Sequence, residues 1–252
     1  MAIARIRDQD LWYEVCGRGP LVTFLHHATA SSRNWRHIVP SLAVRYRTLV
    51  YDRPGFGRSS WLPDWPLDYL DRDVEDLVEL LDLLCIEQTA LVGHSDGAAL
   101  ALMTAARYPQ RVRCVVAEAP HVAVETPRCP DAVRRLAAEV EESPDMQAAL
   151  ARDHGEHGLA VVRRWARRWL DPAFWSWDVS DELAGIVCPV LVIHGADDPF
   201  FSLSHSEMIA GRTVNGELQV ISDAAHVPHN EARGQFIDLA LPFLGRCQET
   251  AR

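Results

Sequence analysis

Gly93-His94-Ser95-Asp96-Gly97 is the stretch on which the interpretation of this chain depends. An apolar segment typical of a strand, 89–92, precedes it, and a helix-forming run, 98–103, follows it. A serine at a sharp turn between a strand and a helix is the arrangement of a nucleophile elbow, which holds the hydroxyl above the sheet. Glycines at both flanks avoid clashes in so tight a turn. The stretch therefore favours a nucleophilic Ser95 over the alternative, a serine that only caps the following helix.

Two later segments offer partners for this serine. One apolar strand-type segment ends at Asp197 and Asp198, and another ends shortly before His226. A serine hydroxyl is a weak nucleophile, so it needs a general base, and the base needs an acid that orients it. The chain order Ser, Asp, His agrees with such a triad. The residues alone leave the acid open between the two adjacent aspartates, and Glu118, which follows another strand, is a further alternative.

These stretches together resemble the α/β-hydrolase-fold family of serine hydrolases, and the resemblance covers nearly the whole chain. The elbow with Ser-Asp-Gly is most similar to that of small-molecule ester hydrolases, amino-acid-ester hydrolases among them. The other matching motifs are Leu25-His26-His27-Ala28, Asp52-Arg53-Pro54-Gly55-Phe56-Gly57-Arg58-Ser59, Cys188-Pro189 with Gly195-x-x-Asp198, and His226-Val227-Pro228-His229-Asn230-Glu231.

The resemblance implies a role for each site residue. Ser95 is the expected nucleophile and His226 the expected general base. Asp198 is the preferred acid, because the family pattern is Gly-x-x-Asp counted from Gly195. The backbone N–H groups of Ala28 and Asp96 are the expected oxyanion hole, although His27 stands where the family usually has glycine. No cofactor and no metal are expected.

The expected substrate pocket contains His27, Asp96, Glu118, Trp165 and Trp169, although structural contacts are an alternative for Glu118. Pockets are mainly apolar and aromatic, which favours the two tryptophans. A carboxylate at position 96 would favour a cationic group such as an α-ammonium. The alternative is a carboxylate that pairs with a local backbone donor or an arginine.

The order of the remaining elements predicts an α/β fold, specifically the α/β-hydrolase fold, with a mostly parallel, doubly wound sheet. Residues 1–15 are expected to form an antiparallel hairpin, and about 34–44 a crossover helix. Between 124 and 185 there are helical segments but no strong strand, so we expect a helical cap inserted over the carboxyl edge of the sheet. The predicted division is a core of 1–123 and 186–252 with a cap of 124–185.

Several weaker patterns have simpler explanations. His226 with His229 gives H-x-x-H, but no carboxylate spacing completes a zinc site. His154 and His157 share that spacing and are expected to face solvent. The loop with Gly55 and Gly57 lacks the third glycine and the Lys-Ser of a phosphate-binding loop. The cluster Arg163, Arg164, Arg167 and Arg168 is interpreted as the solvated face of a helix.

Composition restricts the class of protein. The 252 residues, 48% of them hydrophobic, suit one large domain with an insert. The formal charge of −10 argues against nucleic acid as a partner. The six cysteines are scattered, which favours buried thiols in a reducing compartment over disulfides. The first residues lack a hydrophobic signal core and no stretch is long enough to span a membrane, so we expect a cytoplasmic protein with a small-molecule partner and leave its oligomeric state open.

The sequence thus predicts a serine hydrolase that cleaves a carboxylic ester, lactone or thioester of a small, fairly apolar molecule through an acyl-enzyme. A hydrolase of carbon–carbon bonds in diketones would use the same residues. A binding or signalling protein that kept the fold is the non-enzymatic alternative. Related dehalogenases and epoxide hydrolases use aspartate at the elbow, so the serine at 95 sets them aside.

Overall fold

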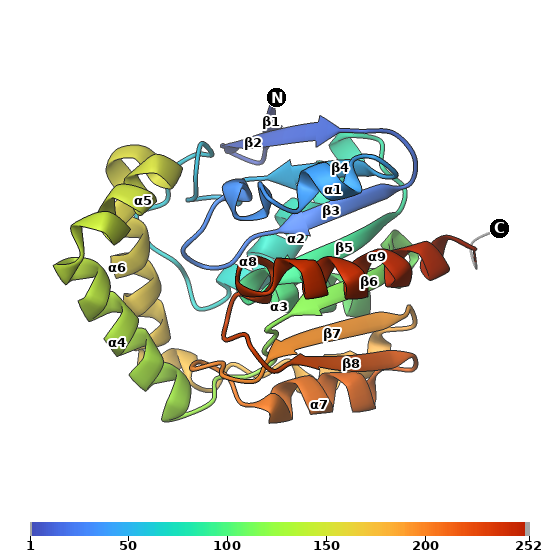
Figure 1. The fold of residues 1–252 in the computed structure, drawn as a ribbon. Helices are drawn as coiled ribbons and strands as arrows, with labels where there is room; N and C mark the ends of the chain where they lie inside the picture. The colour runs from blue at the N-terminus through green and yellow to red at the C-terminus, as the bar shows by residue number, and fades with distance from the viewer. Residues whose placement is uncertain (1, 250–252) are drawn as a thin grey trace.

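An eight-stranded sheet forms the centre of the molecule in a computed structural model that describes residues 2–249 (Figure 1). The strand order is β1-β2-β4-β3-β5-β6-β7-β8. The strands are β1 (Ala2–Ile6), β2 (Gln9–Cys16), β3 (Leu21–Leu25), β4 (Arg47–Tyr51), β5 (Thr89–His94), β6 (Val112–Glu118), β7 (Val190–Gly195) and β8 (Gly216–Ile221).

Most of the sheet is parallel. β1 pairs antiparallel with β2, as the hairpin prediction requires, and β2 pairs antiparallel with β4, whereas all other neighbours run parallel. Every residue of β3, β5 and β7 is buried, because helices cover both faces of these central strands. The predicted α/β-hydrolase architecture with a mostly parallel, doubly wound sheet is confirmed.

Helices cover the sheet in two layers (Figure 1). One apolar cluster joins the sheet to α2 (Tyr69–Leu83), α3 (Asp96–Arg107) and α7 (Leu203–Arg212). The other cluster joins the opposite face to α1 (Val39–Leu42) and α9 (Arg233–Glu249). The carboxyl ends of the parallel strands stay free of both layers, which leaves that edge of the sheet for a site.

The crossover helix predicted over 34–44 is wrong in its length. The structure has a 3-10 helix at Ser32–Trp35 and then the single turn α1. Pro40 occupies the first turn of α1. Proline lacks the backbone N–H and its ring clashes with the preceding turn, so one helix cannot continue through it.

The long segment between β6 and β7 lies beyond the carboxyl ends of the parallel strands (Figure 1). It contributes no strand to the sheet, and Ala123 and Asp178 form an isolated bridge between its two ends. Its helices are α4 (Arg128–Glu142), α5 (Pro144–His154) and α6 (Gly158–Trp169), with 3-10 helices at Gly155–His157, Pro172–Phe174 and Ser180–Gly185. We propose that this segment is the cap, with the boundaries 124 and 185 given above. The remaining short helices are Pro109–Arg111 and α8 (Pro228–Glu231).

Two cap residues expected to face solvent are instead buried against the core. Arg164 is 1% exposed, and its guanidinium donates hydrogen bonds to the carbonyls of Gly55 and Leu62. His154 is also buried: its Nδ1 accepts from the Gly57 N–H at 2.9 Å, and its Nε2 lies 3.1 Å from the Thr29 carbonyl. Both predictions were wrong because loop carbonyls and amides of the core need partners where the cap covers them.

Among the helices of residues 2–249, none combines the length and the apolar character that a membrane span needs.

The six cysteines differ in exposure. Cys16 and Cys85 are exposed, whereas Cys114, Cys129, Cys188 and Cys247 are buried.

Candidate active site

The elbow holds Ser95 in a strained backbone conformation. Its φ of 54° and ψ of −119° lie where residues other than glycine are rarely found. A Cβ at Gly93 would collide with the carbonyl of Gly97, and a Cβ at Gly97 would collide with the carbonyl of Leu25. The Ser95 side chain makes no capping hydrogen bond to α3. The two glycines are therefore required by space, and the capping alternative does not describe this serine.

Three side chains form one chain of hydrogen bonds. Ser95 Oγ lies 3.0 Å from His226 Nε2, and His226 Nδ1 lies 2.7 Å from Asp198 Oδ2. The other carboxylate oxygen, Asp198 Oδ1, accepts from the backbone N–H groups of Phe200 and Phe201 at 2.8 and 3.2 Å. Asp197 is exposed, whereas Asp198 is 2% exposed. Of the two adjacent aspartates, the loop thus brings Asp198 to the histidine.

The surroundings of Asp198 keep it charged. Burial by itself acts to raise the pKa of this carboxyl, but attraction to His226 and the three hydrogen bonds outweigh burial, so the pKa lies below its usual range. An ionised carboxylate at His226 Nδ1 fixes the proton on that nitrogen. Nε2 is then left to accept a proton from Ser95.

A cavity of about 210 Å³ opens above Ser95. Four of the five expected pocket residues line it, namely His27, Asp96, Trp165 and Trp169. The pocket prediction did not include the other lining residues near the nucleophile, which are Thr29, Cys129, Leu136, Phe200, Phe201 and Val227. The two phenylalanines follow the acid loop directly in sequence, and that position could have indicated them. Cys129 and Leu136 belong to α4, and no local sequence pattern indicates that this helix lies close to Ser95.

Ala28, whose backbone N–H is an expected oxyanion donor, and Asp96 both line the cavity beside Ser95. The extra side chain at position 27 is accommodated. The His27 ring lies edge-on to His94 with centroids 4.9 Å apart, and its Nδ1 lies 3.3 Å from Thr29 Oγ1. Burial lowers the pKa of His27 well below its usual value, so the ring is neutral near pH 7.

The Asp96 carboxylate has partners within the protein. Its Oδ2 accepts from the Tyr69 hydroxyl at 2.8 Å, and its Oδ1 lies 3.5 Å from Nε2 of the buried His121. Only 1% of the residue is exposed, and burial raises the pKa of its carboxyl to about 6. The backbone donor or arginine expected in the alternative interpretation is replaced by a tyrosine, which sequence alone did not indicate.

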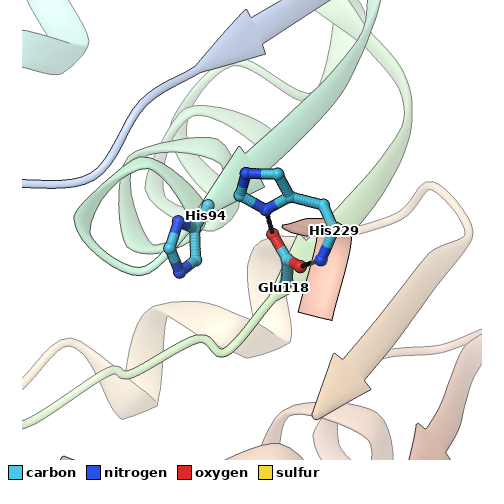
Figure 2. Close-up of side chains that lie close together, drawn as sticks. All are labelled: His94, Glu118 and His229. Atoms are coloured by element: carbon cyan, nitrogen blue, oxygen red, sulfur yellow. Dashed lines mark hydrogen bonds and ion pairs between the residues drawn. The ribbon is translucent and has the colours of Figure 1, made fainter. Parts of the chain in front are cut away.

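Glu118, predicted to line the pocket, is not among the residues that line it. It is fully buried, and its carboxylate accepts from the His229 N–H at 2.5 Å and lies 2.6 Å from His229 Nδ1 (Figure 2). The prediction was wrong because α8 places His229 over the end of β6, where it takes up both carboxylate oxygens. Glu118 therefore anchors the turn that directly follows His226.

Glu118 and His229 lie close to a third possible metal ligand, His94 (Figure 2). His94 Nε2 lies 2.7 Å from the carbonyl of His226, and His229 Nε2 lies 3.2 Å from Asn34 Oδ1. His94 Nδ1 has no hydrogen-bond partner among the described residues, whereas His94 Nε2, both Glu118 oxygens and both His229 ring nitrogens take part in hydrogen bonds around the loop of His226. These contacts fit a role in positioning the loop that carries His226. The absence of a metal at this group stays a prediction.

Comparison with known proteins identifies the family. The model of the alpha/beta hydrolase fold family matches residues 20–172. The chain belongs to the α/β-hydrolase fold family.

Its relatives carry out more than one reaction. The chain is 27% identical to the serine hydrolase BPHL of Mus musculus over 210 residues, which cover 79% of this chain and 70% of that protein. It is 30% identical to the 2-hydroxymuconate semialdehyde hydrolase of Pseudomonas sp. strain CF600 over 261 residues, which cover 93% and 87% of the two chains. A solved hydrolase from Pseudomonas aeruginosa superposes with a TM-score of 0.76 at 25% identity, over 97% of this chain and 98% of that one.

Proposed function

We propose that this protein is a serine hydrolase that cleaves a carboxylic ester, lactone or thioester of a small, fairly apolar molecule. The observation that carries the proposal is the continuous hydrogen-bond chain from Ser95 through His226 to Asp198, which opens into the cavity at Ser95. Aromatic side chains at positions 165, 169, 200 and 201 form much of the cavity wall, which suits an apolar substrate.

In the proposed reaction Ser95 Oγ attacks the carbonyl carbon while His226 Nε2 takes the hydroxyl proton. Asp198 stabilises the imidazolium, and the N–H groups of Ala28 and Asp96 stabilise the oxyanion. His226 then gives the proton to the departing alcohol or thiol. A water molecule attacks the acyl-enzyme with His226 again as base, releases the acid and restores Ser95.

One observation favours a second candidate, hydrolysis of a carbon–carbon bond in a diketone. The relative named 2-hydroxymuconate semialdehyde hydrolase is 30% identical to this chain over most of both chains. The same serine, histidine and oxyanion donors serve either reaction, so only the substrate separates them. A non-catalytic binding protein is the third alternative.

The test is turnover of a panel of p-nitrophenyl esters together with fluorophosphonate labelling. We expect wild type to turn over and label, and Ser95→Ala to do neither. Asp198→Asn should lower kcat by about 10³–10⁴, as expected when the histidine tautomer is wrong, and the matched Asp197→Asn variant should stay near wild type. Labelling without ester turnover favours carbon–carbon cleavage or a binding role. Wild-type rates in Ser95→Ala would reject all serine-based proposals.

A further inference from the structure

A second cavity, of about 360 Å³, adjoins the one above Ser95. His27, Thr29 and Leu136 line both cavities, so these three residues form the boundary between them. The second cavity lies between the loop that follows β3 and the cap helices α4, α5 and α6. It is therefore the adjoining space into which a substrate held at Ser95 can extend.

The first cavity is small for a substrate-binding site. At about 210 Å³ it is smaller than the roughly 300–1,000 Å³ of sites that enclose a ligand of ordinary size. The reacting carbonyl and a short group fill it. A longer substituent extends beyond this cavity, and the second cavity is the neighbouring space beyond His27 and Leu136.

The walls of the second cavity differ in polarity. Apolar side chains of the cap form one wall, namely Leu136, Val140, Met146, Leu150 and Val162. Charged side chains also line this cavity, namely Arg33 and Arg36 from the segment after β3 and Arg152 and Asp153 from α5. A chain of methylene groups matches the apolar side chains, and an anion matches the arginines.

The protein neutralises only one of these three arginines. Arg33 Nε lies 3.1 Å from Asp153 Oδ1, so these two charges cancel. Arg36 donates to the carbonyl of Arg33 at 3.2 Å. Within residues 2–249, neither Arg36 nor Arg152 has a carboxylate within 4.0 Å. Two unmatched positive charges at one cavity stand out in a chain of net charge −10.

We propose that the second cavity is a subsite for the distal part of the substrate, and that this part is an alkyl chain ending in an anion, a carboxylate or a phosphate. The inference rests on the proposed hydrolase function and deepens it. The alkyl chain lies along the apolar wall of the cap, and Arg36 and Arg152 bind the anionic end by charge-assisted hydrogen bonds. His27 contacts the chain where it leaves the first cavity.

Matched ester pairs test this subsite. Monomethyl suberate and methyl octanoate differ in a distal carboxylate on the acyl side, and 8-acetoxyoctanoate and octyl acetate differ in the same way on the alcohol side. We expect wild type to prefer the anionic member of at least one pair about tenfold in kcat/KM, mainly through KM. In Arg36→Gln/Arg152→Gln this ratio should fall to about one, whereas Arg45→Gln, an exposed arginine outside both cavities, should keep the wild-type ratio. The preference should also weaken as salt is added.

A binding measurement separates failure of the subsite from failure of the proposed function. Octanoate and octyl phosphate are titrated into Ser95→Ala by calorimetry, with and without the two arginine changes. Loss of about tenfold in affinity on removing the arginines supports the subsite even if no ester is turned over, and the ligand that loses more identifies the anion. Esters turned over with no anionic preference, or equal affinity with and without the arginines, would overturn the inference.

Discussion

At the scale of single residues, Asp96 lies directly after the proposed nucleophile Ser95, and burial disfavours the charged form of its carboxyl group. Its carboxylate is almost fully buried, and burial raises its pKa from 3.8 to about 6 despite the Tyr69 hydrogen bond. In the unfolded chain the same carboxyl loses its proton near its ordinary value. Between these two values the folded protein holds one more proton than the unfolded chain, so this group makes the free energy of unfolding fall as pH rises from about 4 to about 6.

Asp96→Asn should remove that pH dependence while its amide oxygen still accepts from Tyr69. The difference in unfolding free energy between variant and wild type should shift in favour of the variant by up to about 3 kcal/mol between pH 4 and pH 7. Urea denaturation at a series of pH values measures it. The exposed control Asp223→Asn should follow the wild-type curve. A constant difference across this range would contradict the burial of an ionisable Asp96.

The same variant tests whether Asp96 selects cationic substrates. We expect Asp96→Asn to lose activity toward esters with an α-ammonium group more than toward neutral esters, because only the former gain from a carboxylate in the pocket. The measurement is the ratio of kcat/KM for the two kinds of ester. Equal losses for the two kinds of ester would mean that Asp96 does not select cationic substrates and only contacts Tyr69 and His121.

At the scale of elements, α6 is attached to the core by a buried arginine. Arg164 donates to two loop carbonyls, and its guanidinium carbon lies 4.7 Å from the Trp61 ring centroid and 4.5 Å from that of Trp65. Burial lowers its pKa to about 9, so it is still charged at pH 7. The sequence interpretation of a solvated face holds better for its neighbour Arg163, which is exposed and paired with Glu141.

Arg164→Ala should lower the free energy of unfolding by about 3 kcal/mol or more, because the buried carbonyl of Gly55 and the half-buried carbonyl of Leu62 lose their donor and the ring contacts are lost. Arg163→Ala on the same helix is the control and should change stability little. Thermal and urea unfolding of the two variants compare them. Similar small effects would mean that α6 is not held through Arg164.

At the scale of the whole molecule, the sheet and its two helical layers decide which thiols are reactive. Cys85 is exposed, whereas Cys114 and Cys188 are buried in the core. A hydrogen bond with Cys247 and burial raise the pKa of Cys114, and burial raises the pKa of Cys188. The thiolate is the reactive form, so poor access and the raised pKa both make these two buried thiols slow to react.

Iodoacetamide labelling, located by peptide mass spectrometry, should modify Cys85 at least about 100-fold faster than Cys114 and Cys188, whose reaction waits for opening of the fold. In denaturant the rates should converge. Labelling of Cys114 at the rate of Cys85 in the native protein would contradict the packing of α9 against β6.

Much of this molecule follows from local sequence. The apolar run 89–92 and the apolar segment before Asp197 predict strands, which the structure shows as β5 and β7. The glycines at 93 and 97 predict the elbow, because a tight turn depends on neighbouring residues. The one local failure, the helix over 34–44, arose from underestimating Pro40.

Only the tertiary structure decided between chemically equal candidates. Which of two adjacent aspartates meets His226 depends on how the loop after β7 turns, with the backbone of Phe200 and Phe201 holding Asp198 inward. Glu118 pairs with a histidine 111 residues further along the chain, and Arg164 donates to a carbonyl 102 residues away. The sequence by itself determined the order of strands and helices and the residue types of the site, since these depend on local patterns. Burial, hydrogen-bond partners and the second cavity depend on which distant segments meet, and that is settled only when the cap covers the edge of the sheet.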